Sequence, residues 1–413
     1  MTEKAPLTPR VIATRAVIYA ILIGFGFVMI FPFLYMMSTS FKNSSDVFVY
    51  PPRLLPYSPA QTTLGDENLT LYRFEIEGES RELVATGENV RFGFFTTPEL
   101  VNVDDPRAST ITYQSPLDAA VETGETVTLT SPGGAEDEFD VYTITTEAGE
   151  TQELLLAYRG ALDEFVDPDD PSVVTYAVER TADKVEFVDF QVENYEAVFN
   201  LDLDRALVNT TLVTLLVVAG QLVTSIFGGY AFSRVEFRGR DMIFLLYLGS
   251  IMIPFVVLII PIYRLMVAIG WQNRIVSLIL PWIFTAYGTF LMRQFFITIP
   301  KEIEEAALMD GASRFRILWT IFVPLSTPAI ATLAIFSFLY AWNSFLWPLL
   351  IIGEGNTSNH VLTLALIRLS NSFADQPNLV LTGAAIAILP PVIVFVLAQR
   401  YFVEGIATSG LKG

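Results

Sequence analysis

The sequence has no cysteine and a single histidine, His360, among its 413 residues. Without cysteine the chain forms no disulfide, and one histidine is too few for a histidine-based metal cluster. Lysine is scarce as well. None of the five lysines is followed by serine or threonine, so the phosphate-binding loop G-x-x-x-x-G-K-[ST] is missing. We therefore expect no metal site, no cofactor bound by this chain and no enzymatic activity of its own.

Charge is also sparse, at 17% of residues against 52% hydrophobic residues. Six stretches contain no Asp, Glu, Lys or Arg and reach the roughly 18 residues that indicate a transmembrane helix. They are Ala16–Met37, Ala206–Ser233, Met242–Tyr263, Ile275–Met292, Ile317–Gly353 and Gln376–Gln399. The first is longer than the apolar part of a signal peptide and ends in no A-x-A site, so we expect it to be retained. The composition predicts an all-α polytopic membrane protein with six transmembrane helices.

The net charge of −19 is concentrated in one part of the chain. Residues 39–200 hold 32 acidic and 9 basic residues, whereas the rest holds 12 and 16. Within this acidic part, short runs alternate β-branched or aromatic residues with polar ones, between clusters of Gly, Pro and Asp. That pattern predicts half-buried strands. We therefore expect an N-terminal tail with the first transmembrane helix (1–60), a mainly-β acidic insert (61–190) and a core with five transmembrane helices (191–413).

The insert has the size of one domain, and we expect a β-sandwich or barrel-like module. Its acidic residues are spread throughout, which favours a solvated surface over a docking face for a basic partner. The run Asp167–Asp170 lacks the spaced ligands of a calcium loop and is more typical of a turn. The role of the insert stays open at this point.

Basic residues near the ends of the six stretches indicate the orientation of the chain. With the N-terminus inside, twelve fall on the cytoplasmic side: Lys4, Arg10, Arg15, Arg234, Arg238, Arg240, Arg293, Lys301, Arg314, Arg316, Arg400 and Lys412. Outside the insert, four fall on the other side: Arg205, Arg264, Arg274 and Arg368. We therefore expect a protein of the cell's inner (plasma) membrane with both termini in the cytoplasm and residues 39–200 extracytoplasmic.

The segment between the fourth and fifth stretches carries seven charged residues between positions 301 and 316. Each costs roughly 2.5 to 3.5 kcal/mol at the centre of a membrane helix, so the segment is a cytoplasmic loop. Pro300 favours the start of a helix, and Gly311 favours a left-handed stop. Ser313 can cap a second helix that we expect to run until Pro324. The product is a helix-turn-helix elbow.

This elbow resembles the EAA loop of importer permeases of the ATP-binding-cassette class. The resemblance is carried by Glu305-Ala306-Ala307, then Gly311, then Ile321 and Pro324, and by the following Trp342-Asn343. The sequence around the elbow is similar to the carbohydrate branch of that class, the maltose-type permease with six spans. The similarity covers about 280 residues, everything except the insert. Two departures are Val323, where the family usually has leucine, and the insert itself.

The resemblance implies that the elbow is a coupling helix seated in a cleft of a separate ATPase subunit. The residues expected in this contact are Glu304, Glu305, Ala306, Ala307, Asp310, Gly311, Ala312 and Ser313. It also implies a second permease subunit, two ATPase subunits that bind ATP and Mg²⁺, and an extracytoplasmic solute-binding protein. ATP-driven closure of the ATPases would move the elbow and switch the cavity between inward and outward access.

A sugar pathway through the membrane needs amide, hydroxyl and aromatic groups. Candidates are Asn209, Thr214, Gln221, Tyr287, Trp342 and Asn343, although interhelical hydrogen bonds or ordinary packing would explain the same residues. The predicted function is import of a sugar or oligosaccharide. Two alternatives remain open: a permease of the same class for a polyol phosphate or peptide, and a membrane-anchored sensor with an extracytoplasmic ligand-binding domain.

Overall fold

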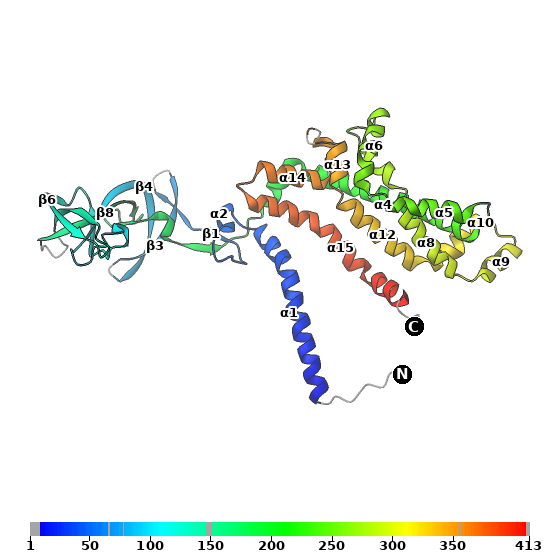
Figure 1. Ribbon diagram of the computed structural model, residues 1–413, viewed down its shortest axis with the longest axis horizontal. Coiled ribbons are helices and arrows are strands. Elements are labelled where there is room, and N and C mark those ends of the chain that lie inside the picture. The colour runs from blue at the N-terminus through cyan, green and yellow to red at the C-terminus, as the bar shows by residue number, and fades with distance from the viewer. Residues whose placement is uncertain are drawn as a thin grey trace. The chain divides into compact units, whose positions relative to one another are not determined.

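The computed structural model describes residues 9–64, 67–76, 78–145, 151–353, 355 and 357–409. The chain forms two compact units, one of Met1–Pro56 with Asp189–Gly413 and one of Tyr57–Val188 (Figure 1). Lys4 and Lys412, two of the basic residues behind the expected orientation, lie outside the described residues. The first unit is helical and the second is β-rich, so the insert is mainly β, as expected.

The β-rich unit is antiparallel throughout its described strands. Its strands are β1 (Tyr57–Pro59), β2 (Gln61–Leu64), β3 (Glu67–Ile76), β4 (Glu79–Thr96), β5 (Tyr113–Pro116), β6 (Val121–Thr130), β7 (Glu136–Thr145), β8 (Thr151–Val166), β9 (Val174–Ala177), β10 (Asp183–Lys184) and β11 (Glu186–Val188). Nine of them form one sheet in the order β10-β3-β4-β8-β7-β6, with β2 on β3, β5 on β4 and β9 on β8. β1 and β11, the first and last strands of the unit, pair separately as a two-stranded ribbon.

The two longest strands, β4 and β8, run through both halves of this sheet. Leu83 and Phe165 contribute to an apolar cluster in one half, and Phe95 to a cluster in the other. At Gly93 the ring of Phe95 occupies the space that a Cβ atom would need, so only glycine fits there. Nine of the described strands thus form one branched sheet, in which β4 and β8 each belong to both halves. The expected sandwich or barrel-like shape stays a prediction.

The helical unit holds the apolar stretches. Its elements are α1 (Pro9–Thr39), α2 (Ser44–Val47), α3 (Glu193–Val198), η3 (Phe199–Leu203), α4 (Asp204–Arg234), α5 (Arg240–Gly249), η4 (Ser250–Met252), α6 (Phe255–Ala268), α7 (Val276–Ile279), η5 (Leu280–Trp282), α8 (Ala286–Thr298), α9 (Lys301–Met309), α10 (Arg314–Ile317), η6 (Leu318–Phe322), α11 (Val323–Leu325), α12 (Thr327–Trp342), α13 (Leu346–Ile351), η7 (Thr357–Asn359), α14 (Leu362–Ser372) and α15 (Pro377–Ser409). Short 3-10 turns η1 (Pro106–Ala108) and η2 (Glu179–Thr181) lie in the β-rich unit.

Three described helices are long and apolar enough to cross a membrane, namely Ile12–Thr39, Glu193–Arg234 and Pro377–Gln399. Three helix pairs reach this length only together, and they bend by 98° (Arg240–Met252 with Phe255–Ala268), 41° (Val276–Trp282 with Ala286–Thr298) and 81° (Arg314–Leu325 with Thr327–Trp342). The described residues therefore provide three spans, or up to six if each bent pair is one span.

The expected stretch Ile317–Gly353 is divided rather than continuous. The chain bends at Ser326 and leaves the helical conformation again at Asn343, before α13 begins. Pro328, at the start of α12, has no N–H with which to continue the preceding helix, and the Asn343 amide donates back to the carbonyl of Leu339, which favours helix ends at these positions. An apolar run alone does not reveal these breaks.

Helix α4 is the centre of the helical unit and packs against α8 and α12 (Figure 1). The contact with α8 is close because Gly229 faces it. A Cβ atom on Gly229 would lie 2.6 Å from Cβ of Met292 and 2.9 Å from the backbone nitrogen of Arg293. Small residues at such crossings let two membrane helices approach without a hydrophobic driving force between them.

A cluster of polar residues joins the C-terminal end of α1 to the N-terminal ends of α3 and α15. We call it the stem cluster, because the residues that lead into and out of the β-rich unit adjoin it. Its members are Ser40, Lys42, Asp46, Asn194, Asn378 and Thr382, all buried. The Asn194 amide donates to the carbonyls of Ser40 (3.0 Å) and Lys42 (2.9 Å). The Thr382 hydroxyl donates to the carbonyl of Ser40 (2.9 Å).

Lys42 carries the charge of the stem cluster and is fully buried. Its ammonium lies 3.3 Å from Oδ2 of Asp46 and donates to the carbonyl of Arg53 at 2.8 Å. A buried ammonium is tolerated only with such partners, because its desolvation costs several kcal/mol. The segment 42–53 is therefore fastened to the helical unit rather than left as a loose link.

Replacing Lys42 by methionine should destabilise the chain strongly, since the Asp46 carboxylate loses its buried cation. Breaking a buried ion pair from one side costs about 3–5 kcal/mol. Thermal unfolding of the purified protein in detergent would measure the loss. Lys301→Met is the matched control, because Lys301 is exposed. Equal midpoints for the two variants would contradict this account of the stem cluster.

Candidate functional site

The elbow is built as two short helices around a left-handed turn. Pro300 caps α9, and Gly311 after its end has φ +80°. The Ser313 hydroxyl accepts a hydrogen bond from the backbone N–H of Arg316 (3.3 Å) and so caps α10. Both ends of the turn follow from the sequence. Glycine adopts a positive φ without steric cost, and serine is a strong N-cap.

The second helix of the elbow differs from the expectation, because it runs through Pro324 and ends at Leu325. Residues Leu318–Phe322 form a π-helical turn, in which the amide of Val323 donates to the carbonyl of Leu318. A wide turn of this kind directly before a proline lets the helix accept a residue that has no N–H. The break comes two residues later, at Ser326, where the chain bends by 81° into α12.

Glu304 faces the protein interior and not a partner, although it stands in a charged loop. Its side chain is only 10% exposed. The hydroxyl of Tyr230 donates to its Oε1 at 3.0 Å, and Nη1 of Arg234 lies 3.6 Å from its Oε2. The sequence grouped Glu304 with the contact residues, and the structure instead turns it toward α4. Tyr230 and Arg234 were missed as part of this site.

Arg234 is the last residue of α4, and its side chain is 3% exposed. It donates to the carbonyl of Phe296 at 2.6 Å and to that of Ile299, at the end of α8. The carbonyl of Phe296 also accepts from the backbone N–H of Ile299 (3.2 Å), so the guanidinium adds further donors at the end of this helix. The guanidinium also lies 5.0 Å from the ring centre of Phe322. One side chain thus contacts α8, α9 and η6 from the end of α4.

The opposite face of the elbow is open. Glu305, Ala306, Asp310, Gly311 and Ser313 are exposed. Ala307 and Ala312 are half-buried and pack on the apolar cluster beneath, which includes Phe296 and Ile317. The eight residues expected at the contact therefore divide into five outward-facing residues, two half-buried alanines and the buried Glu304.

Two exposed apolar side chains complete the open face, and the sequence analysis did not name them. Met309 is 88% exposed at the end of α9, and Phe315 is 63% exposed on α10. Met309 lies four residues after Glu305 and therefore on the same helical face, a spacing that would have revealed it. The flexible thioether of Met309, which lies beside alanines, can fit an apolar pocket on another protein.

Most of the polar atoms proposed for the pathway are used within the chain. The Asn209 amide donates to the carbonyls of Ser358 (3.0 Å) and His360 (2.9 Å). The Gln221 amide donates to the carbonyl of Trp282 (2.7 Å). The indole N–H of Trp342 donates to the carbonyl of Ala387 (3.1 Å). These three residues join separate elements of the helical unit.

The other three candidates differ among themselves. Thr214 is buried, with no hydrogen-bond partner for its hydroxyl among the described residues. Tyr287 is 44% exposed and meets Phe336 edge to face. Asn343 is exposed and donates back to the carbonyl of Leu339. The structure does not gather the six candidates around one cavity.

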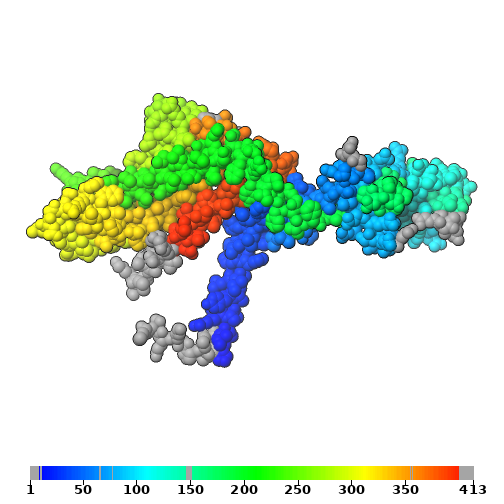
Figure 2. Space-filling view, turned by 180° about the vertical axis from the view of Figure 1, so that it is seen from behind, coloured from blue at the N-terminus to red at the C-terminus, as the bar shows by residue number. Residues whose placement is uncertain are grey.

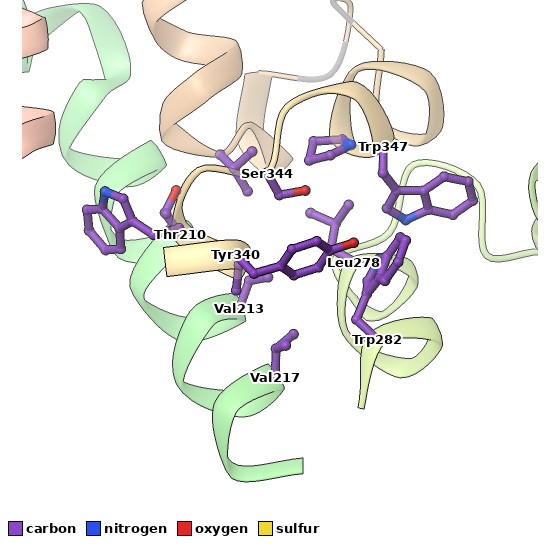
Figure 3. Close-up of a pocket in the computed structure, with 12 residues that line it drawn as sticks. Thr210, Val213, Val217, Leu278, Trp282, Tyr340, Ser344 and Trp347 are labelled. Atoms are coloured by element: carbon purple, nitrogen blue, oxygen red, sulfur yellow. The ribbon is translucent and has the colours of Figure 1, made fainter. Parts of the chain in front are cut away.

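A small pocket with a cavity volume of about 20 Å³ lies between α4, α12 and the segments around α7 and α13 (Figure 3). Aromatic rings dominate its wall, with Tyr340 5.6 Å from Trp282 and Trp282 6.2 Å from Trp347 between ring centres. Thr210 and Ser344 add hydroxyl groups. Of the six candidates, Trp342 lines this pocket. Wall residues from four separate segments could not be assembled from sequence spacing.

Comparison with known proteins identifies the class. Residues 220–408 match the family described as "Binding-protein-dependent transport system inner membrane component". The "Arabinooligosaccharides transport system permease protein AraQ" of Halalkalibacterium halodurans is 36% identical over 207 residues, 50% of this chain and 73% of that protein. The chain belongs to this family. This permease is the membrane subunit of an ATP-binding-cassette importer, and the resemblance seen in its sequence is confirmed.

A second curated relative agrees with this assignment. The "sn-glycerol-3-phosphate transport system permease protein UgpE" of Brucella melitensis is 36% identical over 232 residues, 54% of this permease and 81% of that protein. A solved bacterial ABC transporter "involved in the import of the acidic polysaccharide alginate" is similar with a TM-score of 0.47 and 24% identity, covering 52% of this chain and 81% of that chain. The family match lies wholly within the helical unit of the permease.

Replacing Gly311 by alanine should loosen the elbow of the permease. No atom lies within 4 Å of the added Cβ, so the effect comes from the backbone alone, at about 1–2 kcal/mol. Hydrogen exchange over residues 301–325 should accelerate roughly 5–30-fold, the equilibrium factor for that energy. Gly311→Asn is the control, since asparagine tolerates a positive φ better. Equal exchange in both variants would show that the left-handed turn is not what holds the elbow.

Proposed function

We propose that this permease moves a sugar or oligosaccharide into the cell by alternating access, driven by separate ATPase subunits that contact its elbow. The observation that supports this proposal is the structure of the elbow. It is an exposed, low-relief surface on a segment too charged for lipid, held tightly to the ends of two membrane helices. The arabino-oligosaccharide relative supports a sugar as solute, and the glycerol-3-phosphate relatives keep a polyol phosphate as the alternative.

The elbow and the stem cluster lie at opposite ends of α4. This helix has 31 residues and spans about 46 Å at 1.5 Å per residue. Its first residue follows α3 and η3, next to the stem cluster, and its last residue is Arg234 at the elbow. That separation exceeds the roughly 30 Å of a bilayer core. It supports an orientation with the elbow and both termini in the cytoplasm and residues 39–200 outside.

The open face of the elbow is the proposed contact with an ATPase subunit. Ala306 and Met309 provide close apolar contact, while Glu305 and Asp310 flank them with charge. ATP and Mg²⁺ belong to the ATPases in this proposal, since the chain has no phosphate-binding loop. Two ATPase subunits would be needed, one for each of two permease subunits. Their closure around bound ATP would move both elbows.

A second permease subunit is supported by the surface of α1. Its apolar side chains from Ile12 to Leu34 are exposed, and no part of its 18-residue apolar window is buried. Figure 2 shows the helix leaving the rest of the helical unit after contact with α15 near one end. Lipid and a second permease together would cover this surface. An extracytoplasmic binding protein would deliver the solute to the outer side.

For the pathway, Tyr287 and Asn343 are the best placed of the six candidates because their side chains are exposed. Asn209, Gln221 and Trp342 already bond to other elements, so a solute would have to replace those bonds. Thr214 is buried and is not among the residues that line the pocket described above. We therefore rank Tyr287 and Asn343 first as pathway residues. Asn209, Gln221 and Trp342 follow, and Thr214 comes last.

Ala306→Glu should separate the permease from its ATPase, because a buried unpaired carboxylate at the contact is costly. Co-purification of the ATPase and ATP-driven uptake of labelled arabinotriose or glycerol 3-phosphate in membrane vesicles should each fall at least about tenfold, equivalent to 1.4 kcal/mol. Ala306→Ser is the conservative control and should behave like the wild type. Ala306 is preferred to Ala307, whose half-buried side chain contacts the core. Normal co-purification of the glutamate variant would refute the contact.

Removing Tyr57–Val188 should leave the ATPase bound. The backbone N–H of Asp189 donates to the carbonyl of Pro56 at 3.1 Å, so a link of two to four glycine or serine residues can rejoin the chain. The stem cluster stays intact in this variant. If the deletion variant folds and inserts in the membrane but no longer co-purifies with the ATPase, the β-rich unit does not lie on the extracytoplasmic side as proposed. Complete absence of an ATPase partner in both proteins would favour the sensor alternative.

A further inference from the structure

The ion pair between Arg234 and Glu304 is buried within an apolar cluster formed by Ile226, Met292, Phe296, Ile317 and Phe322. Such a pair is expensive to desolvate, and well-packed apolar residues often stabilise a protein equally well. Its stability contribution therefore does not account for its presence. A directional bond does something that apolar packing does not, which is to fix the relative position of the elements that it joins.

The elements joined here are those that a moving elbow must displace. Arg234 and Tyr230 are four residues apart on α4 and reach the same carboxylate on α9. The same guanidinium holds the carbonyls of Phe296 and Ile299 where α8 ends. α4 and α8 are in turn packed closely through Gly229. Displacement of α9 thus acts on both membrane helices through one side chain.

The remaining contacts beneath the elbow are apolar. Ala307 and Ala312 pack against the apolar cluster to which Phe296, Ile299 and Leu318 belong. Packing of this kind resists separation but gives little resistance to sliding, because dispersion contacts have no preferred direction. A hydrogen-bonded ion pair weakens steeply when its angle or length changes. The ion pair is therefore the contact that opposes sliding of α9 along α4.

We propose that Arg234, paired with Glu304, is the positioning residue that makes the elbow, α4 and α8 move as one body. The proposal rests on the proposed function, in which the elbow receives force from an ATPase. It assigns a separate task to each side of α9. The outward residues, with Glu305 and Ala306 among them, bind the ATPase, whereas the inward Glu304 transmits the movement that follows.

The test measures the distance between α9 and α4 in the assembled transporter. Because the chain has no cysteine, Glu302→Cys on α9 and Leu215→Cys on α4 are specific sites for spin labels once the partner subunits are free of cysteine. Both positions are exposed. With the full complex in lipid, the distance distribution should be narrow and the same with and without ATP and vanadate. Movement as one body predicts this constancy.

Glu304→Gln is the decisive variant, because glutamine keeps the size and an oxygen acceptor for Tyr230 but removes the charge facing Arg234. The ATPase should co-purify and hydrolyse ATP as in the wild type, while the α9–α4 distance broadens or shifts by several ångströms when ATP and vanadate are added. Arg234→Lys retains a charge without the planar fork and should give an intermediate distribution. Glu305→Gln, one residue away and outward, should leave the distance unchanged.

The outcomes separate this proposal from the proposed function. An unchanged narrow distance in Glu304→Gln, with the ATPase bound and active, would overturn the role of Arg234 and leave the elbow contact standing. An ATPase that never co-purifies with the unmodified permease would overturn both. If Glu304→Gln fails to assemble, Arg234→Lys carries the test, and an unchanged distance there would refute the proposal.

Discussion

Charge cannot remain in hydrocarbon, yet the charged elbow of this permease has to stay joined to apolar membrane helices. The structure meets both demands at Arg234. Its guanidinium and the Glu304 carboxylate neutralise each other at the end of α4, while the carbonyls at the end of α8 take up further N–H groups of the same side chain. The outer face of the elbow is thereby left open, and its inner face is firmly joined to the helices. Without Arg234, the hydrogen bond from Tyr230 to Glu304 and apolar packing would remain.

Helix α4 links two polar clusters of similar design. At its far end the stem cluster uses Lys42 and Asp46 as the ion pair and Asn194 as the amide that holds two backbone carbonyls. Between them the helix packs on α8 through glycine, without charges. Hydrogen bonds also tie its middle to other elements, because Gln221 donates to the carbonyl of Trp282 and Thr224 to that of Ile283. Directional bonds at both ends and along its length fix the position of this helix relative to its neighbours.

The β-rich unit follows different rules. None of its described acidic residues is buried, and the long strands β4 and β8 each contribute to more than one of its three described apolar clusters. The family match does not extend to the β-rich unit, so it does not indicate what this unit binds. A solvated surface accounts for the spread of its acidic residues, and the stem cluster accounts for its firm attachment point on the chain.

The sequence by itself determined the class of the protein, the mainly-β insert and the local shape of the elbow. These features depend on composition, on alternation over a few residues and on single residues such as Gly311 and Ser313, whose conformational preferences act locally. The tertiary structure decided which way Glu304 faces, where the run from Ile317 bends, and that Asn209 and Gln221 bond to distant backbone carbonyls. A side chain's orientation and partners depend on contacts between residues far apart in the chain, such as Arg234 and Glu304, and no local pattern specifies those contacts.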